Sequence, residues 1–161
     1  MRERPSARVV LLDPEGRIAL MRGRLPGASR DELGAWFTVG GGLEPGESLA
    51  EAAVREVREE TGLEASEVGP VIWLREGVFD PGLGSGPLYF KESYIVARCD
   101  GGELSRDGWL AHEQDFCTDL RWWTREELLA TTDNVYPQRL AMLLEDVLDG
   151  RLPESPLSLP W

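Results

Sequence analysis

The feature that most constrains the fold is a sharply delimited helix, predicted over residues 49–61. Ser48 followed by Glu51 has the spacing of a capping box, in which each side chain binds the backbone N–H of the other residue at the start of a helix. Gly62 supplies the left-handed residue that commonly ends one. One side of the helix is apolar, through Leu49, Ala53, Val54 and Val57. We therefore expect this helix to cover another apolar layer.

Strand patterns lie on both sides of this helix. Residues 9–12 and 18–21 are β-rich and flank a Pro- and Gly-containing turn, so they predict a hairpin. Further strands are predicted at 36–39, 70–75, 88–98 and 116–123, and further helices after a second capping box at Thr124 and Glu127 and over 138–148. Loops are predicted at 23–34, 80–87 and 107–115. These elements predict an α/β fold, a mixed sheet covered by helices, without choosing its topology.

Length and charge restrict what the chain can be. With 161 residues and 42% hydrophobic composition, we expect a single domain over residues 1–150 and a Pro-rich, extended tail over 151–161. The net charge of −12 argues against a nucleic-acid polymer as partner, because such binders need clustered basic residues. The same acidity would repel a phosphorylated small molecule unless a divalent cation lies between them.

The compartment is predicted from what the sequence does not contain. Its two cysteines, Cys99 and Cys117, have neither a zinc-site spacing nor the density of a disulfide scaffold, so we expect free thiols. The short apolar run over residues 7–12 does not fit a signal peptide, and no stretch approaches the roughly 20 apolar residues of a membrane span. We expect a cytoplasmic protein without a membrane partner.

Three carboxylates of the predicted helix fall on one side. At about 100° per residue, Glu56, Glu59 and Glu60 lie within a single arc of about 100°, bordering the apolar stripe. Most such runs are solvated helix faces. Here, however, the like charges oppose helix formation by a few tenths of a kcal/mol each, and Arg55 and Arg58 offset only part of that. A hard cation such as Mg²⁺ or Mn²⁺ would convert the repulsion into binding. The residues alone leave both interpretations open.

A longer motif surrounds these glutamates. Residues 41–63 match Gly-x5-Glu-x7-Arg-Glu-U-x-Glu-Glu-x-Gly-U, where U is a bulky aliphatic residue, at every specified position. This pattern resembles the Nudix box, and it is matched through Gly41, Glu47, Arg55, Glu56, Val57, Glu59, Glu60, Gly62 and Leu63. The resemblance implies a Nudix-type α/β/α sandwich with a central mixed β-sheet. It also implies a Mg²⁺-dependent hydrolase, with Mn²⁺ as an alternative metal, that adds water to a phosphoanhydride bond.

The resemblance also implies roles for individual residues. Glu56, Glu59 and Glu60 would be both the metal-binding core and part of the catalytic set, with Glu56 closest to the activated water. Two further catalytic residues would be Glu47, which completes the acidic site, and Arg55, which orients the glutamates. The carbonyl of Gly40 would offer one more metal ligand.

The general base of this family is not fixed within the box. In several branches it is a glutamate of a later loop, and Glu113 is the candidate here, next to His112, the only histidine. The plainer interpretation, an exposed loop acid, is favoured by about two to one.

The substrate implied is a small nucleoside diphosphate linked to another group. An ADP-ribose-like compound or another nucleotide sugar is placed slightly ahead of a nucleoside triphosphate. The substrate-binding residues are unknown from the sequence, but the loops at 23–34, 80–87 and 107–115 are the candidates, and a homodimer is left open. Two alternatives remain. One is an isopentenyl diphosphate isomerase, whose additional catalytic residues are not recognisable here. The other is a non-catalytic Nudix-fold sensor that binds a nucleotide or ADP-ribose, although such regulators commonly carry degraded boxes.

Overall fold

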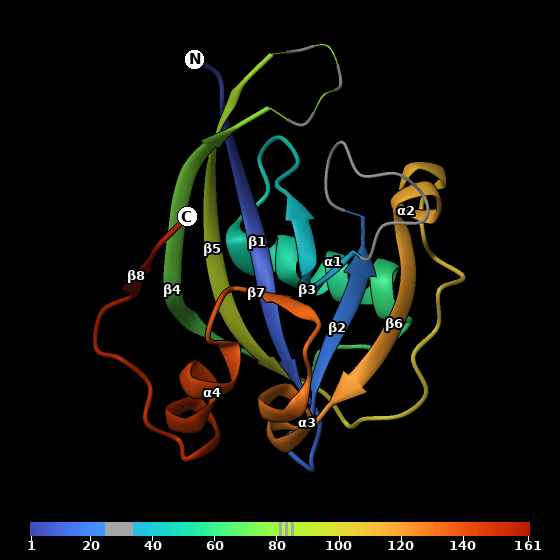
Figure 1. Ribbon diagram of the computed structural model, residues 1–161, viewed down its shortest axis with the longest axis vertical. Helices are drawn as coiled ribbons and strands as arrows, with labels where there is room; N and C mark the ends of the chain where they lie inside the picture. Colours follow the sequence, from blue (N-terminus) through green and yellow to red (C-terminus); the bar gives the residue numbers. More distant parts are fainter. Residues whose placement is uncertain (25–33, 81, 83, 85) are drawn as a thin grey trace.

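The computed structural model describes residues 1–24, 34–80, 82, 84 and 86–161, without the side chains of residues 112, 113 and 115 (Figure 1). Within this part of the chain, one mixed eight-stranded sheet forms the centre, with helices on both of its faces. The strand order is β6-β2-β3-β1-β5-β4-β8, and β7 pairs with β3. The strands are β1 (Glu3–Leu12), β2 (Ile18–Gly23), β3 (Ala35–Gly42), β4 (Glu67–Phe79), β5 (Leu88–Arg98), β6 (Cys117–Trp123), β7 (Asn134–Tyr136) and β8 (Leu157–Leu159).

Parallel and antiparallel pairs occur together, which confirms the predicted mixed sheet. β1 pairs in parallel with β5, as β3 does with β7 and β4 with β8. The other neighbours are antiparallel. The long parallel pair of β1 and β5 forms the middle of the sheet. Both strands are largely buried towards their C-terminal ends.

Helix α1 (Leu49–Thr61) has the ends that the sequence predicts. Ser48 and Glu51 form both hydrogen bonds of the capping box, and Gly62 ends the helix with a φ of 74°. The apolar side of α1 packs against one face of the sheet, where Ala52, Ala53 and Val57 join a core cluster with residues of β1, β2, β3 and β5. This packing fixes the carboxylate-bearing side of α1 next to the end of β3.

The other face of the sheet carries two helices near one end. These are α3 (Arg125–Ala130), which begins at the predicted Thr124 and Glu127 capping box, and α4 (Leu140–Leu148). Leu128, Leu140 and Leu144 pack with Trp36 and Tyr94 in a second core cluster. In Figure 1, α3 and α4 lie at this end of the sheet.

The structure corrects three predictions. The segment 107–115, expected to be a loop, contains most of α2 (Ala111–Phe116). The backbone N–H of Gln114 donates to the carbonyl of Leu110, and the side-chain amide of Gln114 donates to the carbonyl of Trp109. The expected hairpin of residues 9–12 and 18–21 pairs only at Leu12 and Ile18, because β2 pairs mainly with β3 and β6. Strand β7 was not predicted, since three residues carry no periodicity.

The C-terminal segment lies along the edge of the sheet. Its strand β8 pairs in parallel with β4, with Leu159 opposite Arg75 (Figure 1). Most of the predicted loop 23–34 lies outside the described residues. Among the residues that are described, no helix is both long enough and apolar enough to cross a membrane.

Candidate active site

The three glutamates of α1 gather where the helix passes the end of β3. Glu56 and Glu60 are buried, whereas the side chain of Glu59 is 34% exposed. The backbone N–H of Gly40 donates a hydrogen bond of 2.6 Å to Oε1 of Glu60. A Cβ on Gly41 would lie 2.6 Å from Oε1 of Glu56, so any other residue at position 41 would displace the Glu56 carboxylate. The last residues of β3 and the glutamates of α1 therefore form one site.

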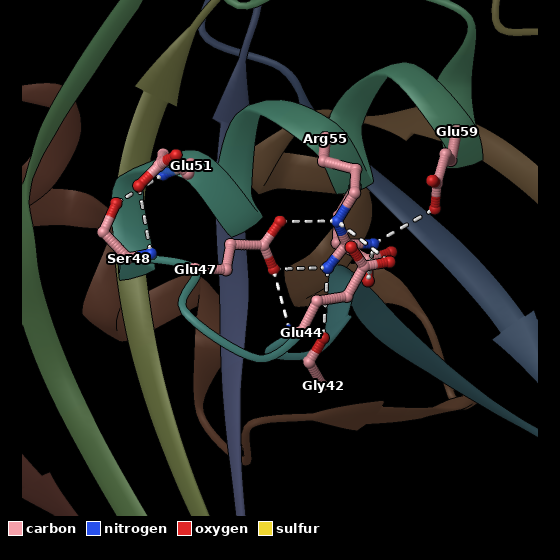
Figure 2. Close-up of polar contacts among 8 residues, drawn as sticks. Gly42, Glu44, Glu47, Ser48, Glu51, Arg55 and Glu59 are labelled. Carbon is pink, nitrogen blue, oxygen red and sulfur yellow. Dashed lines mark hydrogen bonds and ion pairs between the residues drawn. The ribbon is translucent and has the colours of Figure 1, made fainter.

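Arg55 connects most of the acidic residues of this site (Figure 2). Its Nε and Nη2 donate to the two carboxylate oxygens of Glu47 at 2.7 and 2.8 Å. Its Nη1 donates to Glu56 at 3.0 Å and to Glu59 at 3.2 Å, and Nη2 also reaches the carbonyl of Gly42 at 3.1 Å. One planar guanidinium thus fixes three carboxylates and a loop carbonyl, which the single charge of a lysine would do less well.

The electrostatics separate Glu47 from Glu56. The hydrogen bond from Arg55 lowers the pKa of Glu47 to about 2 and also raises the pKa of Arg55 above its usual value. Burial raises the pKa of Glu56, although hydrogen bonds with Glu60 and Arg55 oppose the shift. Glu47 is therefore an anion at neutral pH, while Glu56 is a buried carboxylate whose charge the site does not fully neutralise.

This excess of acid fits a divalent cation. Two buried carboxylates side by side are unfavourable unless something neutralises them, and carboxylate oxygens are the ligands that Mg²⁺ and Mn²⁺ prefer. In the described part of the chain, no three metal-binding side chains already converge into a cage. Instead, Glu59 and Glu56 bond Arg55, and Glu60 bonds Gly40, so small rotations would have to direct their oxygens to a metal. The carbonyl of Gly40 accepts a hydrogen bond from Nη1 of Arg8 at 3.1 Å.

The Glu47–Arg55 pair predicts a dependence of stability on pH. Because the pKa of Glu47 falls from 4.5 to about 2 on folding, its contribution to stability is complete above 4.5 and is lost as the pH falls towards 2. We expect the difference in melting temperature between wild type and Glu47→Gln to be largest at neutral pH and to shrink through that window. Thermal unfolding of both proteins across this range measures it, and a difference independent of pH would contradict the assignment.

A cavity of about 1190 Å³ opens beside the glutamates. Glu56, Glu59 and Glu60 line one part of it, so a ligand in the cavity can reach all three. This volume is sufficient for a nucleotide-sized ligand. Six arginines also line the cavity, although the chain is strongly acidic overall: Arg2, Arg4, Arg8, Arg24, Arg55 and Arg75. The cavity thus offers cations for phosphate groups together with carboxylates for a metal.

Arg8 is a residue of this cavity that sequence reasoning missed. Its guanidinium donates to the backbone oxygens of Thr38 and Gly40, and so it fixes the end of β3 from the neighbouring strand. Burial acts to lower the pKa of Arg8, but Glu92, Tyr94, Glu60 and Glu56 outweigh it and raise the pKa. The signal available in the sequence was the alternation of polar residues in β1, with Arg4, Ser6 and Arg8 on one face.

The structure does not bring every predicted residue to the site. The side chain of Glu113 lies outside the described residues, and its backbone belongs to α2 rather than to a loop. Its proposed role as general base therefore stays a prediction. In contrast, Glu47, Arg55, Glu56, Glu59 and Glu60 do lie together. Helix spacing predicted this only for the three glutamates of α1, whereas the place of Glu47 and Arg55 was implied by the resemblance to the Nudix box.

Sequence comparison identifies relatives over part of their length. The chain is 35% identical over 100 residues to "Nucleoside triphosphatase NudI" of Enterobacter sp. (strain 638), covering 59% of this chain and 65% of that protein. It is 40% identical over 101 residues to "Putative 8-oxo-dGTP diphosphatase" of Bacillus subtilis (strain 168), covering 62% and 56%. It is 41% identical over 56 residues to "CTP pyrophosphohydrolase" of Escherichia coli (strain K12), covering 35% and 39%. The matches thus span less than two thirds of each of these relatives.

Solved structures and a family model also resemble this chain. The fold is similar to the crystal structure of a MutT NUDIX hydrolase from Burkholderia pseudomallei, with a TM-score of 0.63 and 23% identity, covering 91% of this chain and 99% of that one. It is also similar to the solution structure of the E. coli ORF135 protein, with a TM-score of 0.55 and 25% identity, covering 94% and 92%. The family model described as "NUDIX domain" matches residues 2–143, and the chain therefore belongs to the Nudix domain family.

Proposed function

We propose that this protein is a divalent-metal-dependent pyrophosphohydrolase that cleaves a phosphoanhydride bond of a nucleotide. The observation that carries the proposal is the gathering of Glu56, Glu59 and Glu60 on one wall of a nucleotide-sized cavity, held in place by Arg55 and the Gly40 backbone. Residues matching the box supply this wall, and the family match covers most of the chain.

The proposed roles follow from these contacts. Glu56, Glu59 and Glu60 would hold Mg²⁺ or Mn²⁺, joined by the Gly40 carbonyl. When bound, the metal would neutralise phosphate charge and lower the pKa of a coordinated water. Arg55 would orient Glu56 and Glu59, and Glu47 would in turn fix Arg55 through two hydrogen bonds. Glu56, the glutamate for which the box implies a place closest to the attacking water, would receive a proton from it.

The names of the relatives bear on the choice among substrates. The names of the relatives, a nucleoside triphosphatase, a CTP pyrophosphohydrolase and a putative 8-oxo-dGTP diphosphatase, favour a nucleoside triphosphate. One structural neighbour is named an ADP-ribose pyrophosphatase, and its 18% identity supports the fold alone. We therefore place a nucleoside triphosphate ahead of an ADP-ribose-like compound. The cytoplasmic location remains an expectation from the sequence.

A substrate panel tests this function. The protein is incubated with the common nucleoside triphosphates, ADP-ribose and nucleotide sugars, with and without Mg²⁺, in ¹⁸O-labelled water. We expect metal-dependent release of a nucleoside monophosphate and pyrophosphate from at least one triphosphate, with the label showing which phosphorus is attacked. Binding across the panel without any turnover would overturn the proposal in favour of a non-catalytic sensor.

A further inference from the structure

A row of paired residues crosses the sheet from the candidate active site to the C-terminal strand. Gly42 of β3 lies opposite Ser6 of β1, Ser6 opposite Glu92 of β5, Glu92 opposite Arg75 of β4, and Arg75 opposite Leu159 of β8. Neighbouring strands are about 4.8 Å apart, so Arg75 lies roughly 14 Å from Gly42. Both residues line the same cavity. Arg75 therefore belongs to a part of the cavity wall that lies three strands away from Gly42 and the glutamates beside it.

Polar atoms in this row lack hydrogen-bond partners. Of the three buried side-chain atoms without a partner in the described part of the chain, two are Oγ of Ser6 and Nε of Arg75. Nε of Arg75 lies 3.2 Å from Oε2 of Glu92, an ion pair without good hydrogen-bond geometry, and these side chains are only 13% and 15% exposed. Oε2 of Glu92 accepts a bond from Tyr94 at 3.1 Å. Buried polar groups are normally satisfied, so the hydrogen-bonding capacity of Ser6 and of the Arg75 Nε is not fully used by the described residues.

Aromatic rings bracket the same arginine. The Arg75 guanidinium lies 4.5 Å from the ring centroid of Trp161 and 5.6 Å from that of Tyr136. The Tyr136 ring stacks on Phe37, with centroids 5.6 Å apart. All four side chains line the cavity, yet they come from β3, β4, β7 and the C-terminal segment. The tertiary structure therefore builds a stacked wall that no local motif encodes.

The position of Trp161 depends on a glycine. A Cβ on Gly77 would lie 2.1 Å from Cδ2 of the indole, so β4 leaves a gap that the indole occupies. The pairing of β8 with β4 brings the C-terminal segment to this gap. Trp161 nevertheless remains 46% exposed, so part of its surface is available to a ligand.

We propose that Arg75, Glu92 and Trp161 form a specificity subsite that binds the nucleobase of the substrate. The exposed part of the Trp161 ring would provide stacking surface for a planar heterocycle. The terminal nitrogens of Arg75, which have no hydrogen-bond acceptor among the described residues, donate to the ring acceptors of the base, and Oε1 of Glu92 accepts from a ring or amino N–H. The subsite rests on the proposed nucleotide hydrolysis, because it takes the base of a nucleotide whose phosphates reach the glutamates.

Binding of compounds that cannot be hydrolysed tests the subsite separately from the reaction. Calorimetry on the full chain with Mg²⁺ compares AMP, GMP, CMP and UMP with ribose 5-phosphate, which lacks the base. We expect at least one monophosphate to bind about tenfold or more tightly than ribose 5-phosphate, as expected for a stacked base. We expect Trp161→Ala and Arg75→Met to remove most of that difference and to leave the affinity for ribose 5-phosphate unchanged.

Two further variants sharpen the test. Gly77→Val retains the indole but removes its gap, so it should weaken monophosphate binding as Trp161→Ala does. Arg121→Met is the matched control: Arg121 also lies between two rings, 3.7 Å from the Trp123 centroid and 5.9 Å from that of Trp36, but it is absent from the described cavity lining. It should bind the monophosphates as wild type does.

The outcomes separate this inference from the proposed function. Failure of all four monophosphates to bind better than ribose 5-phosphate, or wild-type discrimination in Trp161→Ala and Arg75→Met, would overturn the subsite even if the protein hydrolyses nucleotides. Base-dependent binding that these variants abolish would support it even if no substrate in the panel is turned over.

Discussion

The Glu56→Gln protein is expected to lose at least about 100-fold in kcat/KM. Removing a residue that only orients a metal ligand typically costs about 10- to 100-fold in activity, and removing the ligand itself should cost more. Its folded structure should persist, since glutamine has nearly the same shape and retains one oxygen acceptor. Turnover of the best substrate from the panel, measured at saturating Mg²⁺, provides the test.

The metal-free form of the same variant should be more stable than wild type at neutral pH. Burial raises the pKa of Glu56 above its unfolded value of 4.5, so ionised Glu56 destabilises the folded state progressively as the pH rises from 4.5 through the folded pKa. Glutamine removes that penalty. We expect the melting temperature without metal to rise in Glu56→Gln and the stabilisation by added Mg²⁺ to be lost.

The control is Glu64, which lies just after α1 and is absent from the described cavity lining. Glu64→Gln removes an exposed carboxylate that pairs with Arg58 at 2.6 Å, and it should leave both kcat/KM and the response to Mg²⁺ unchanged. Turnover in Glu56→Gln within a few-fold of wild type, or an undiminished shift with Mg²⁺, would show that Glu56 is not a metal ligand.

The Arg55→Met protein is expected to lose about 2–3 kcal/mol of unfolding free energy, because its partners would remain partly buried without a cation. Nitrogens of Arg55 lie within hydrogen-bond distance of Glu47, Glu56, Glu59 and the Gly42 carbonyl, and its side chain is only 21% exposed. Turnover should fall as well, since the orientation of Glu56 and Glu59 depends on it. Denaturant unfolding and steady-state kinetics measure the two effects.

Arg58→Met is the matched control for this loss. Arg58 belongs to the same helix and forms an ion pair with Glu64, but its side chain is 60% exposed, so removing it should lower the unfolding free energy far less than removing Arg55 does. Similar losses in the two variants would show that the network around Arg55 is no stronger than a surface ion pair.

Local patterns were sufficient to predict α1 and its acidic face. The capping box at Ser48 and Glu51 and the stop at Gly62 depend on neighbours within a few residues, and the structure confirms them. The grouping of Glu56, Glu59 and Glu60 follows from helix geometry alone, and their position beside the Gly40–Gly42 segment follows from the short connection between β3 and α1. Strand β5 was predicted with its observed bounds, because the strand pattern of residues 88–98 is also contained in one segment.

Other features depended on contacts that no local pattern records. Strand β7 is only three residues long and is defined by its pairing with β3, and α2 replaces a predicted loop through bonds involving Trp109 and Gln114. The role of Arg8 at the end of β3 could not be predicted, because residues 8 and 40 meet only when β1 and β3 pair.

The sequence by itself determined the helix, its caps and the acidic side of the site, because these follow from spacing within one segment. The mixed-sheet class followed from the order of the predicted strands and helices along the chain. Only the tertiary structure decided the strand order, the cavity and the part of its wall that holds Arg75. Arg75, Tyr136 and Trp161 lie far apart in the sequence and meet only because β4 pairs with β8 and β7 pairs with β3. Their assembly depends on long-range pairing that no window of the sequence contains.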